Sequence, residues 1–286
     1  MTGVNANNLD KPFRMRLAGL VLAALFLLAL APCGAALAED KKPGKLTKVT
    51  LQLKWAHQFQ FAGYYAAKAK GFYRSRGLDV TITPAQPGHK PMESVADGNA
   101  EFGVGTTDLL MMRAAGKPVV VLAVVYQHSP LSLMLDARSE FHNIHQLARG
   151  KIMIAPHETE LLAYFAAEGL DVKHLNFVDH TFNTHDLQGG RVDAMSVYST
   201  DEPYEYEREV GPVRLFRPID GGIDFYGDNL FTTQNMIDKD PKLVQAFLDA
   251  SLEGWRYAMS HQEEIVDLIL DEYSTRKTRD NLVYEA

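Results

Sequence analysis

Polar and apolar positions follow two different periods along the chain from residue 46 onward. Residues 47–53 alternate between polar and apolar side chains, which predicts a half-buried strand. Residues 59–70 have a helical composition and are followed by Gly71, a residue type that commonly ends a helix. The same two patterns recur as strands over 78–83, 101–105 and 119–125 and a helix over 106–115. The continuous apolar run at 119–125 predicts a strand buried on both faces, and the series as a whole predicts a parallel sheet covered by helices.

A second series starts after Ser129-Pro130. Its strands are predicted over 151–155 and 192–198, and its helices over 158–168 and 201–209. Residues 211–228 carry many glycines and prolines, which favours irregular backbone. A strand over 230–234, helices over 241–273 and a further helical pattern over 275–286 complete the chain.

The two series predict an α/β protein of two lobes, each built on a mainly parallel sheet covered by helices. We assign residues 46–126 together with 226–286 to lobe 1, and residues 131–217 to lobe 2. The chain then leaves lobe 1 and later returns to it, and two such crossings form a hinge.

The N-terminal 38 residues have the pattern of a secretory signal peptide. Basic residues precede an apolar run at 17–31, and small residues end in Ala-Leu-Ala at 36–38. We expect cleavage after Ala38, a flexible leader over 39–45, and a processed chain in the periplasm. A retained membrane anchor is the alternative, because about 20 apolar residues can span a bilayer.

Composition and motifs exclude several classes of function. The formal net charge is -7 and no basic block is present, so nucleic acid is not expected as a partner. The single cysteine, Cys33, lies in the N-terminal apolar stretch, which leaves the processed chain without a thiol. A phosphate-binding P-loop, a G-x-S-x-G elbow and an H-E-x-x-H motif are missing from the sequence. The ten histidines lack a metal-ligand spacing, so we expect no metal and no cofactor.

An aromatic cluster after the first strand is the first candidate for ligand binding. Flat rings flanked by amide groups suit a planar heterocycle, which gains from stacking and from in-plane hydrogen bonds. We predict that Trp55, Gln58 and Tyr64 face the ligand, and that Phe61 and Tyr65 pack in the core.

A glycine-rich strand end is the second candidate. The strand ends in Gly103-x-Gly105, and Thr106, Thr107 and Asp108 then open a helix whose free N–H groups and hydroxyls can bind a polar ligand. Asp108 stands where a dinucleotide fingerprint has its third glycine, and a carboxylate there would repel pyrophosphate. A plain helix cap without a ligand is the alternative.

Two acidic clusters complete the candidate site. Tyr198, Asp201 and Glu202 follow a strand and open a helix, the place where α/β sheets present groups to ligands. Asp224, Tyr226 and Asp228 lie at the presumed second crossing. Their carboxylates can accept hydrogen bonds from an exocyclic amine or a protonated ring nitrogen. Helix caps and hinge positions are the alternative reading of both clusters.

Several of these segments together resemble the NMT1/THI5-like solute-binding family. The resemblance rests on LQLKW at 51–55, FQFAGYY at 59–65, residues 103–110, 194–202 and 221–231, and SLEGW at 251–255. It covers nearly all of residues 46–286 and implies a type II periplasmic-binding-protein fold that closes on its ligand. It also implies an aminopyrimidine precursor of thiamine as ligand, and an ABC transporter permease or a membrane signalling module as partner. The ending at 273–286 is most similar to the sensor-fused branch.

One branch of this family is enzymatic and makes the thiamine pyrimidine, as its phosphate, from pyridoxal phosphate and its own histidine. That branch has a lysine and a histidine where this chain has Val104 and Asp108, and a cysteine motif where this chain has residues 224–232, which contain no cysteine. Without the amine no Schiff base can form, and without the histidine the substrate is missing. We therefore expect a binding protein, with the pyrimidine synthase as the alternative.

Overall fold

The computed structural model describes residues 45–86 and 89–286. The predicted signal peptide and nearly all of the predicted leader lie outside these residues. Within the described part of the chain, no helix is both long enough and apolar enough to cross a membrane.

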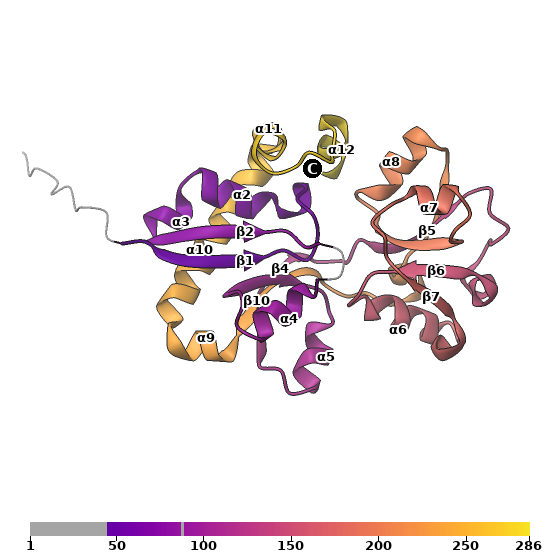
Figure 1. Cartoon of the computed structure of the whole chain (residues 1–286), viewed down its shortest axis with the longest axis horizontal. Helices are drawn as coiled ribbons and strands as arrows, with labels where there is room; N and C mark the ends of the chain where they lie inside the picture. Colours follow the sequence, from indigo (N-terminus) through magenta and orange to yellow (C-terminus); the bar gives the residue numbers. More distant parts are fainter. Residues whose placement is uncertain (1–44, 87–88) are drawn as a thin grey trace, which may run out of the picture. The chain divides into compact units, whose positions relative to one another are not determined.

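The first sheet has the strand order β2-β1-β3-β10-β4 (Figure 1). Strand β1 pairs in parallel with both β2 and β3, whereas β10 runs antiparallel between β3 and β4. Four strands therefore point the same way, and only β10, which enters late in the chain, opposes them. The strands are β1 (Thr47–Gln52), β2 (Leu78–Thr83), β3 (Phe102–Gly105), β4 (Val119–Tyr126) and β10 (Gly227–Thr233).

Helices bury both faces of this sheet. One apolar core lies between the strands β1, β2 and β3 and the helices on one face of the sheet. These helices are η1 (Phe59–Phe61), α2 (Ala62–Ala69), α3 (Phe72–Ser75), α10 (Pro241–Ser260), α11 (Gln262–Glu272) and α12 (Arg279–Glu285). A smaller core under the other face uses α4 (Pro91–Ala96) and α5 (Leu109–Ala114). Helix α9 (Gln234–Lys239) follows β10. We call this part of the molecule lobe 1.

The second sheet has the order β7-β6-β8-β5-β9. Strand β6 pairs in parallel with β7 and β8, and β5 runs antiparallel between β8 and β9. Its strands are β5 (Leu131–Asp136), β6 (Lys151–Ile154), β7 (Asn176–Asp179), β8 (Ala194–Tyr198) and β9 (Val213–Phe216). The cores on its faces use η2 (Ile144–Arg149), α6 (Thr159–Ala167), η3 (Val172–His174), α7 (His185–Gln188) and α8 (Glu202–Glu209). We call this part lobe 2.

The chain crosses between the lobes at 127–130 and again at 222–226, between η4 (Pro218–Gly221) and β10. The Ser129 N–H donates to the Phe225 carbonyl at 2.8 Å, so the two crossings lie side by side. A Cβ on Gly227 would come within 3.2 Å of the Pro130 ring, which explains the glycine at this close approach.

The predicted fold class is confirmed, because each sheet has four strands in one direction and helices on its faces. Three local predictions are wrong. Residues 211–228 are not irregular throughout: they contain β9, η4 and the start of β10. Strand β4 is an edge strand whose residues are mostly only half-buried, because no strand of the described residues pairs beyond it. The helix expected from residue 106 begins at Leu109. The helix expected over 275–286 forms as α12.

Candidate functional site

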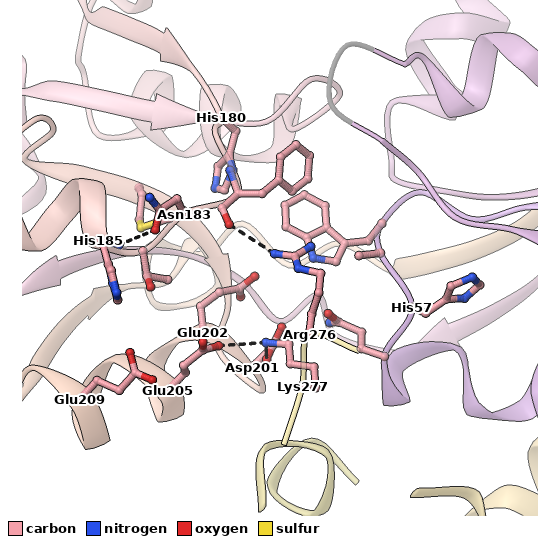
Figure 2. Close-up of a pocket in the computed structure, with 16 residues that line it drawn as sticks. His57, His180, Asn183, His185, Asp201, Glu202, Glu205, Glu209, Arg276 and Lys277 are labelled. Carbon is pink, nitrogen blue, oxygen red and sulfur yellow. Dashed lines mark hydrogen bonds and ion pairs between the residues drawn. The ribbon is translucent and has the colours of Figure 1, made fainter. Parts of the chain in front are cut away.

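Strand ends from both sheets converge on two neighbouring cavities. In open α/β sheets, ligands bind beyond the carboxyl ends of the strands. The residues that follow β1, β6, β7 and β8 supply most of the lining. One cavity, of about 340 Å³, opens toward α8 and the C-terminal segment (Figure 2). The other, of about 260 Å³, opens toward β3 and the start of α6. We call them the α8 cavity and the α6 cavity.

An aromatic wall separates the two cavities. Trp55, His180 and Phe182 line both of them. The Trp55 ring comes from lobe 1, and its centroid lies 4.2 Å from that of Phe182 and 5.5 Å from that of His180 in lobe 2. A flat ligand on either side therefore meets an aromatic face or edge, the surface that stacks best against a planar heterocycle.

His180 is held as one neutral tautomer. Its Nδ1 lies 2.9 Å from the Phe182 N–H and accepts that hydrogen bond, so its Nε2 carries the proton and donates to the Ser196 carbonyl at 2.9 Å. Burial lowers the pKa of His180 below its ordinary value. The ring thus fixes the position of Phe182 and adds no charge to the site.

Left-handed backbone concentrates at this site. Among the described residues, three that are not glycine have a positive φ: His157 at 65°, Phe182 at 62° and Asp228 at 50°. The first two line the α6 cavity, and Asp228 lies fully buried where the chain re-enters lobe 1. Such conformations cost about 1–3 kcal/mol each and occur where surrounding contacts enforce them, often at binding sites.

A charged network joins the lobes beneath the aromatic wall. Lys54 donates to the Tyr198 hydroxyl at 2.5 Å and lies 3.3 Å from the Asp228 carboxylate. The Tyr198 hydroxyl in turn donates to Asp228 at 2.9 Å, and the Gln60 amide donates to the other oxygen at 2.9 Å. Asp228 is therefore a buried carboxylate whose charge is compensated by the chain itself.

The α6 cavity is closed by contacts between the lobes. The Thr106 hydroxyl donates to the His157 carbonyl at 2.7 Å, and the His157 ring lies 3.0 Å from Glu93. Glu158 accepts the Ala155 N–H at 2.9 Å, and burial raises the pKa of this carboxyl to about 7. At neutral pH Glu158 can therefore either donate or accept a hydrogen bond.

The α8 cavity is acidic. Asp201 and Glu202 are buried at the start of α8, and Glu205 and Glu209 follow on the same helix. Burial, followed by the charge of Asp201, raises the pKa of Glu202 to about 8. Lys277 reaches into the cluster and binds Asp201 at 2.5 Å and Glu205 at 3.1 Å. Four carboxyl groups thus line this cavity together with one arginine, Arg276, and one lysine, Lys277, and this excess of acceptors favours ligands with hydrogen-bond donors.

The structure brings five of the twelve predicted site residues to these cavities and a sixth close to them. Trp55 and Gln58 line the α8 cavity with Asp201 and Glu202, and Thr106 lines the α6 cavity. Tyr198 lies with Trp55 in a small gap between them. Two buried carboxylates serve contacts between the lobes instead: Asp228 as described, and Asp108, which accepts the Thr159 N–H at 3.1 Å. This bond places a negative charge at the N-terminus of α6.

Four predicted residues lie elsewhere. Tyr64 is buried beside Trp255 and lines a separate cavity of about 570 Å³ in lobe 1. Asp224 is exposed and pairs with His128 where the two crossings lie side by side, and Tyr226 is 55% exposed. Thr107 is half-buried and, like these two, lines neither the α6 nor the α8 cavity. Phe61 and Tyr65, predicted as packing residues, are both in the core.

Sequence reasoning did not single out six residues of the site. Lys54, His157 and Glu158 come shortly after predicted strands, so the strand-end rule that identified Tyr198 could have found them. The others depend on the positions of loops and of the chain end, for which the sequence carries no local signal. The six are Lys54, His157, Glu158, His180, Phe182 and Lys277. Within residues 45–86 and 89–286, no group of three or more His, Cys, Asp or Glu side chains is arranged to hold a metal ion.

Comparison with known proteins decides the family. Residues 58–265, most of the chain, match the family described as NMT1/THI5 like. The chain belongs to the NMT1/THI5-like family. Among curated proteins, the riboflavin-binding protein RibY of Chloroflexus aurantiacus is 25% identical to this chain over 275 residues, which cover 90% of this chain and 78% of RibY.

Solved structures agree with the fold. The periplasmic aliphatic sulphonate binding protein SsuA of Escherichia coli aligns with a TM-score of 0.64 at 16% identity, over 83% of this chain and 82% of SsuA. The periplasmic nitrate-binding protein NrtA of Synechocystis PCC 6803 aligns with a TM-score of 0.59 at 14% identity, over 84% of this chain and 69% of NrtA. The NMT1/THI5-like chain is thus a solute-binding protein with the periplasmic-binding-protein fold, and not an enzyme.

Proposed function

We propose that this protein captures a small planar nitrogen heterocycle outside the cytoplasm, an aminopyrimidine precursor of thiamine being the specific candidate. The lobes close on the ligand, and the closed form is recognised by an ABC transporter permease or by a membrane signalling module. The signal peptide predicted over residues 1–38 supports export to the periplasm.

The observation that carries this proposal is the aromatic wall flanked by one buried carboxyl, Glu202, and one half-buried carboxyl, Glu158. Trp55 and Phe182 offer ring faces on both sides, and Glu158 and Glu202 border the two cavities. Burial raises the pKa of Glu158 to about 7 and, together with the charge of Asp201, that of Glu202 to about 8. Such carboxyls can pair with an edge that carries both an amine donor and a ring-nitrogen acceptor, which is the pattern of an aminopyrimidine.

The acidic α8 cavity supports a neutral or cationic ligand over an anion. Asp201, Glu202, Glu205 and Glu209 border it, and SsuA and NrtA, which are named for anionic ligands, share only the fold with this chain. The pyrimidine synthase alternative is disfavoured, because Val104 is buried inside β3 and Asp108 is engaged with the N-terminus of α6.

Riboflavin is the second candidate ligand. RibY is named as a riboflavin-binding protein, and the α6 and α8 cavities share the Trp55 wall, so a larger planar ligand could extend across both. The two candidates have the same chemistry of a flat ring with in-plane polar groups and differ mainly in size.

A thermal-shift screen tests the proposal. The panel holds hydroxymethyl and formylated aminopyrimidines, riboflavin, thiamine, pyridoxal phosphate, an alkanesulfonate and nitrate. A ligand at 100 times its dissociation constant should add about 2.7 kcal/mol of stability. We expect a shift with an aminopyrimidine that Trp55→Ala abolishes. Trp255→Phe is the matched control. Trp255 is the second of the two tryptophans of the chain, and it lines the separate cavity in lobe 1 beside Tyr64. A shift with riboflavin alone would make riboflavin, and not an aminopyrimidine, the ligand. A shift with only the alkanesulfonate or nitrate would overturn the proposal.

A further inference from the structure

The C-terminal segment, residues 274–286, contacts both lobes. Its apolar anchor is in lobe 1, where Leu282 of α12 is fully buried in the main core. Its polar and aromatic side chains reach lobe 2, where α12 packs on α8. The segment therefore bridges α8 of lobe 2, which lines the α8 cavity, and η1 of lobe 1, which directly follows the cavity-lining residues 55–58.

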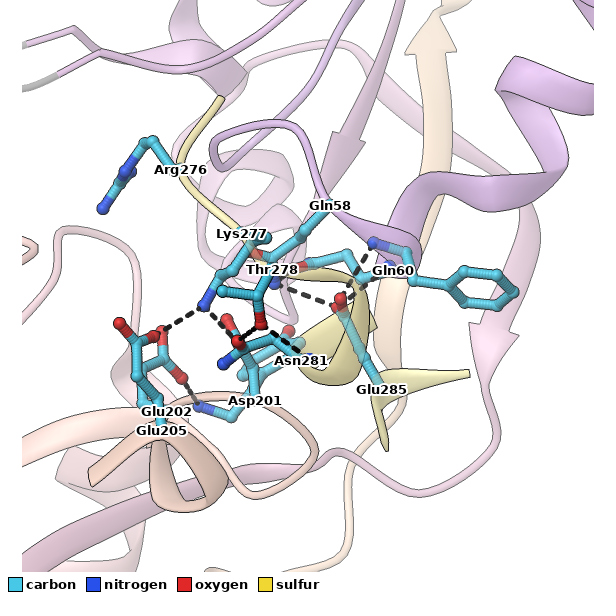
Figure 3. A network of polar contacts seen from close by, with 12 residues as sticks. Gln58, Gln60, Asp201, Glu202, Glu205, Arg276, Lys277, Thr278, Asn281 and Glu285 are labelled. Carbon is cyan, nitrogen blue, oxygen red and sulfur yellow. Dashed lines mark hydrogen bonds and ion pairs between the residues drawn. The ribbon is translucent and has the colours of Figure 1, made fainter. Parts of the chain in front are cut away.

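On the lobe 1 side the bridge ends in Glu285. Its carboxyl accepts the Phe59 N–H at 2.8 Å, the Gln60 N–H at 2.9 Å and the Gln58 side-chain amide at 3.0 Å (Figure 3). These donors are the first free groups of η1, a short distance along the chain from Trp55. One side chain from the end of the chain thus fixes the turn that carries the aromatic wall.

On the lobe 2 side the bridge is an ion pair supported by stacking. Lys277 is 10% exposed, and Figure 3 shows it between Asp201 and Glu205, which it binds at 2.5 and 3.1 Å. The Tyr284 ring stacks on Tyr204 of α8 with centroids 4.3 Å apart. Burial lowers the pKa of Lys277, but the neighbouring carboxylates of Asp201 and Glu202 outweigh it and raise the pKa overall, so the lysine is charged.

We propose that Lys277 and Glu285 are positioning residues of the ligand site, which hold its two walls together before a ligand binds. Removal of Lys277 leaves Asp201, one of whose oxygens already has no partner among the described residues, buried beside Glu202 and Glu205. The C-terminal segment then no longer attracts α8, and the buried Asp201 without its ion-pair partner is stabilised by access to water, so α8 moves away from η1. A site whose walls are already drawn together binds more tightly, because ligand binding has less of the closure to supply.

Trp55 reports this closure without any ligand. In a Trp255→Phe background it is the only tryptophan, and its contact with Phe182 crosses between the lobes. We expect Lys277→Met to red-shift its emission and to raise the acrylamide quenching constant, with a larger radius of gyration in X-ray scattering. Lys277→Arg should restore the wild-type values. The matched control is Lys117→Met, which removes an exposed ion pair with Asp97 in lobe 1.

Two further variants keep the test decisive if Lys277→Met does not fold. Tyr284 is 51% exposed, so Tyr284→Ala should fold and shift the Trp55 signal in the same direction by a smaller amount. Glu285→Ala removes the contact on the lobe 1 side and should also shift the Trp55 signal in the direction of Lys277→Met. Its control is Glu272→Ala, at an exposed position. Folded variants whose Trp55 signal matches the controls would overturn the proposal. The outcome is independent of the ligand, so it can succeed or fail separately from the proposed function.

Discussion

The Tyr198 hydroxyl donates a hydrogen bond to the Asp228 carboxylate at 2.9 Å and so links the end of β8 in lobe 2 to the start of β10 in lobe 1. Asp228 has a left-handed φ of 50° and is completely buried. The bond therefore stabilises a strained residue at the point where the chain returns from the second lobe to the first.

Tyr198→Phe should destabilise the protein by about 2 kcal/mol, because a hydrogen bond to a buried charged group is lost. Lys54 and Gln60 still bind Asp228, so the variant should fold. Urea unfolding measures the change. Tyr226→Phe, which removes a hydroxyl from a ring that is 55% exposed, should leave the free energy of unfolding almost unchanged. Equal values for the two variants would contradict the role given to this bond.

Glu202→Gln should flatten the pH dependence of stability between about pH 4.5 and pH 8. Burial raises the pKa of Glu202 from 4.5 to about 8, so over this range the folded protein holds a proton that the unfolded chain has released. Stability contributed by this proton is complete below the unfolded pKa and is lost as the pH rises through the folded one. The limiting slope is about 1.4 kcal/mol per pH unit for one proton.

The measurement is the free energy of unfolding at several pH values from 5 to 8. Glu209→Gln is the control, because Glu209 is exposed on the same helix and should keep the wild-type slope. Glu158 and Glu160, whose pKa values burial raises to about 7, keep part of the slope in both variants. An unchanged slope in Glu202→Gln would show that this carboxyl is already ionised in the fold.

Gly254→Ala should destabilise lobe 1, although alanine is the better helix former by about 1 kcal/mol. A Cβ on Gly254 of α10 would lie 2.1 Å from the Gly63 carbonyl and 2.6 Å from the Ala67 Cβ of α2. Neither group can move without separating the two helices, so we expect a net loss of about 1–3 kcal/mol in thermal unfolding. Gln245→Ala, at an exposed position of α10, should be neutral or slightly stabilising. A stabilised Gly254→Ala variant would rule out this close helix contact.

Leu282→Ala should remove about 2–4 kcal/mol of stability, because it opens a cavity where a fully buried leucine anchors α12. The adjacent Val283→Ala is the control, since Val283 is 44% exposed. Chemical unfolding of both variants gives the comparison. Similar small losses in the two would mean that α12 is only loosely attached to lobe 1.

The sequence alone determined the features that depend on local periodicity. Alternation over 47–53 and 78–83 located β1 and β2 to within a residue. The aromatic cluster after the first strand led to Trp55, and the strand-end rule led to Tyr198 and Glu202. The short motifs along the chain also indicated the family, which the match over residues 58–265 confirms. These signals lie within a few residues of one another, so a pattern of side chains suffices to read them.

Tertiary structure decided the rest, because it depends on contacts between distant segments. Strand β9 forms in a stretch rich in glycine and proline because β5 pairs with it. Tyr64 faces Trp255 instead of the cleft because packing of α2 on α10 sets which side of the helix is buried. Lys277 and Glu285 reach their partners across 76 and 227 residues of chain. Separations of that length leave no periodic trace in the sequence, so only the folded chain shows which side chains complete the site.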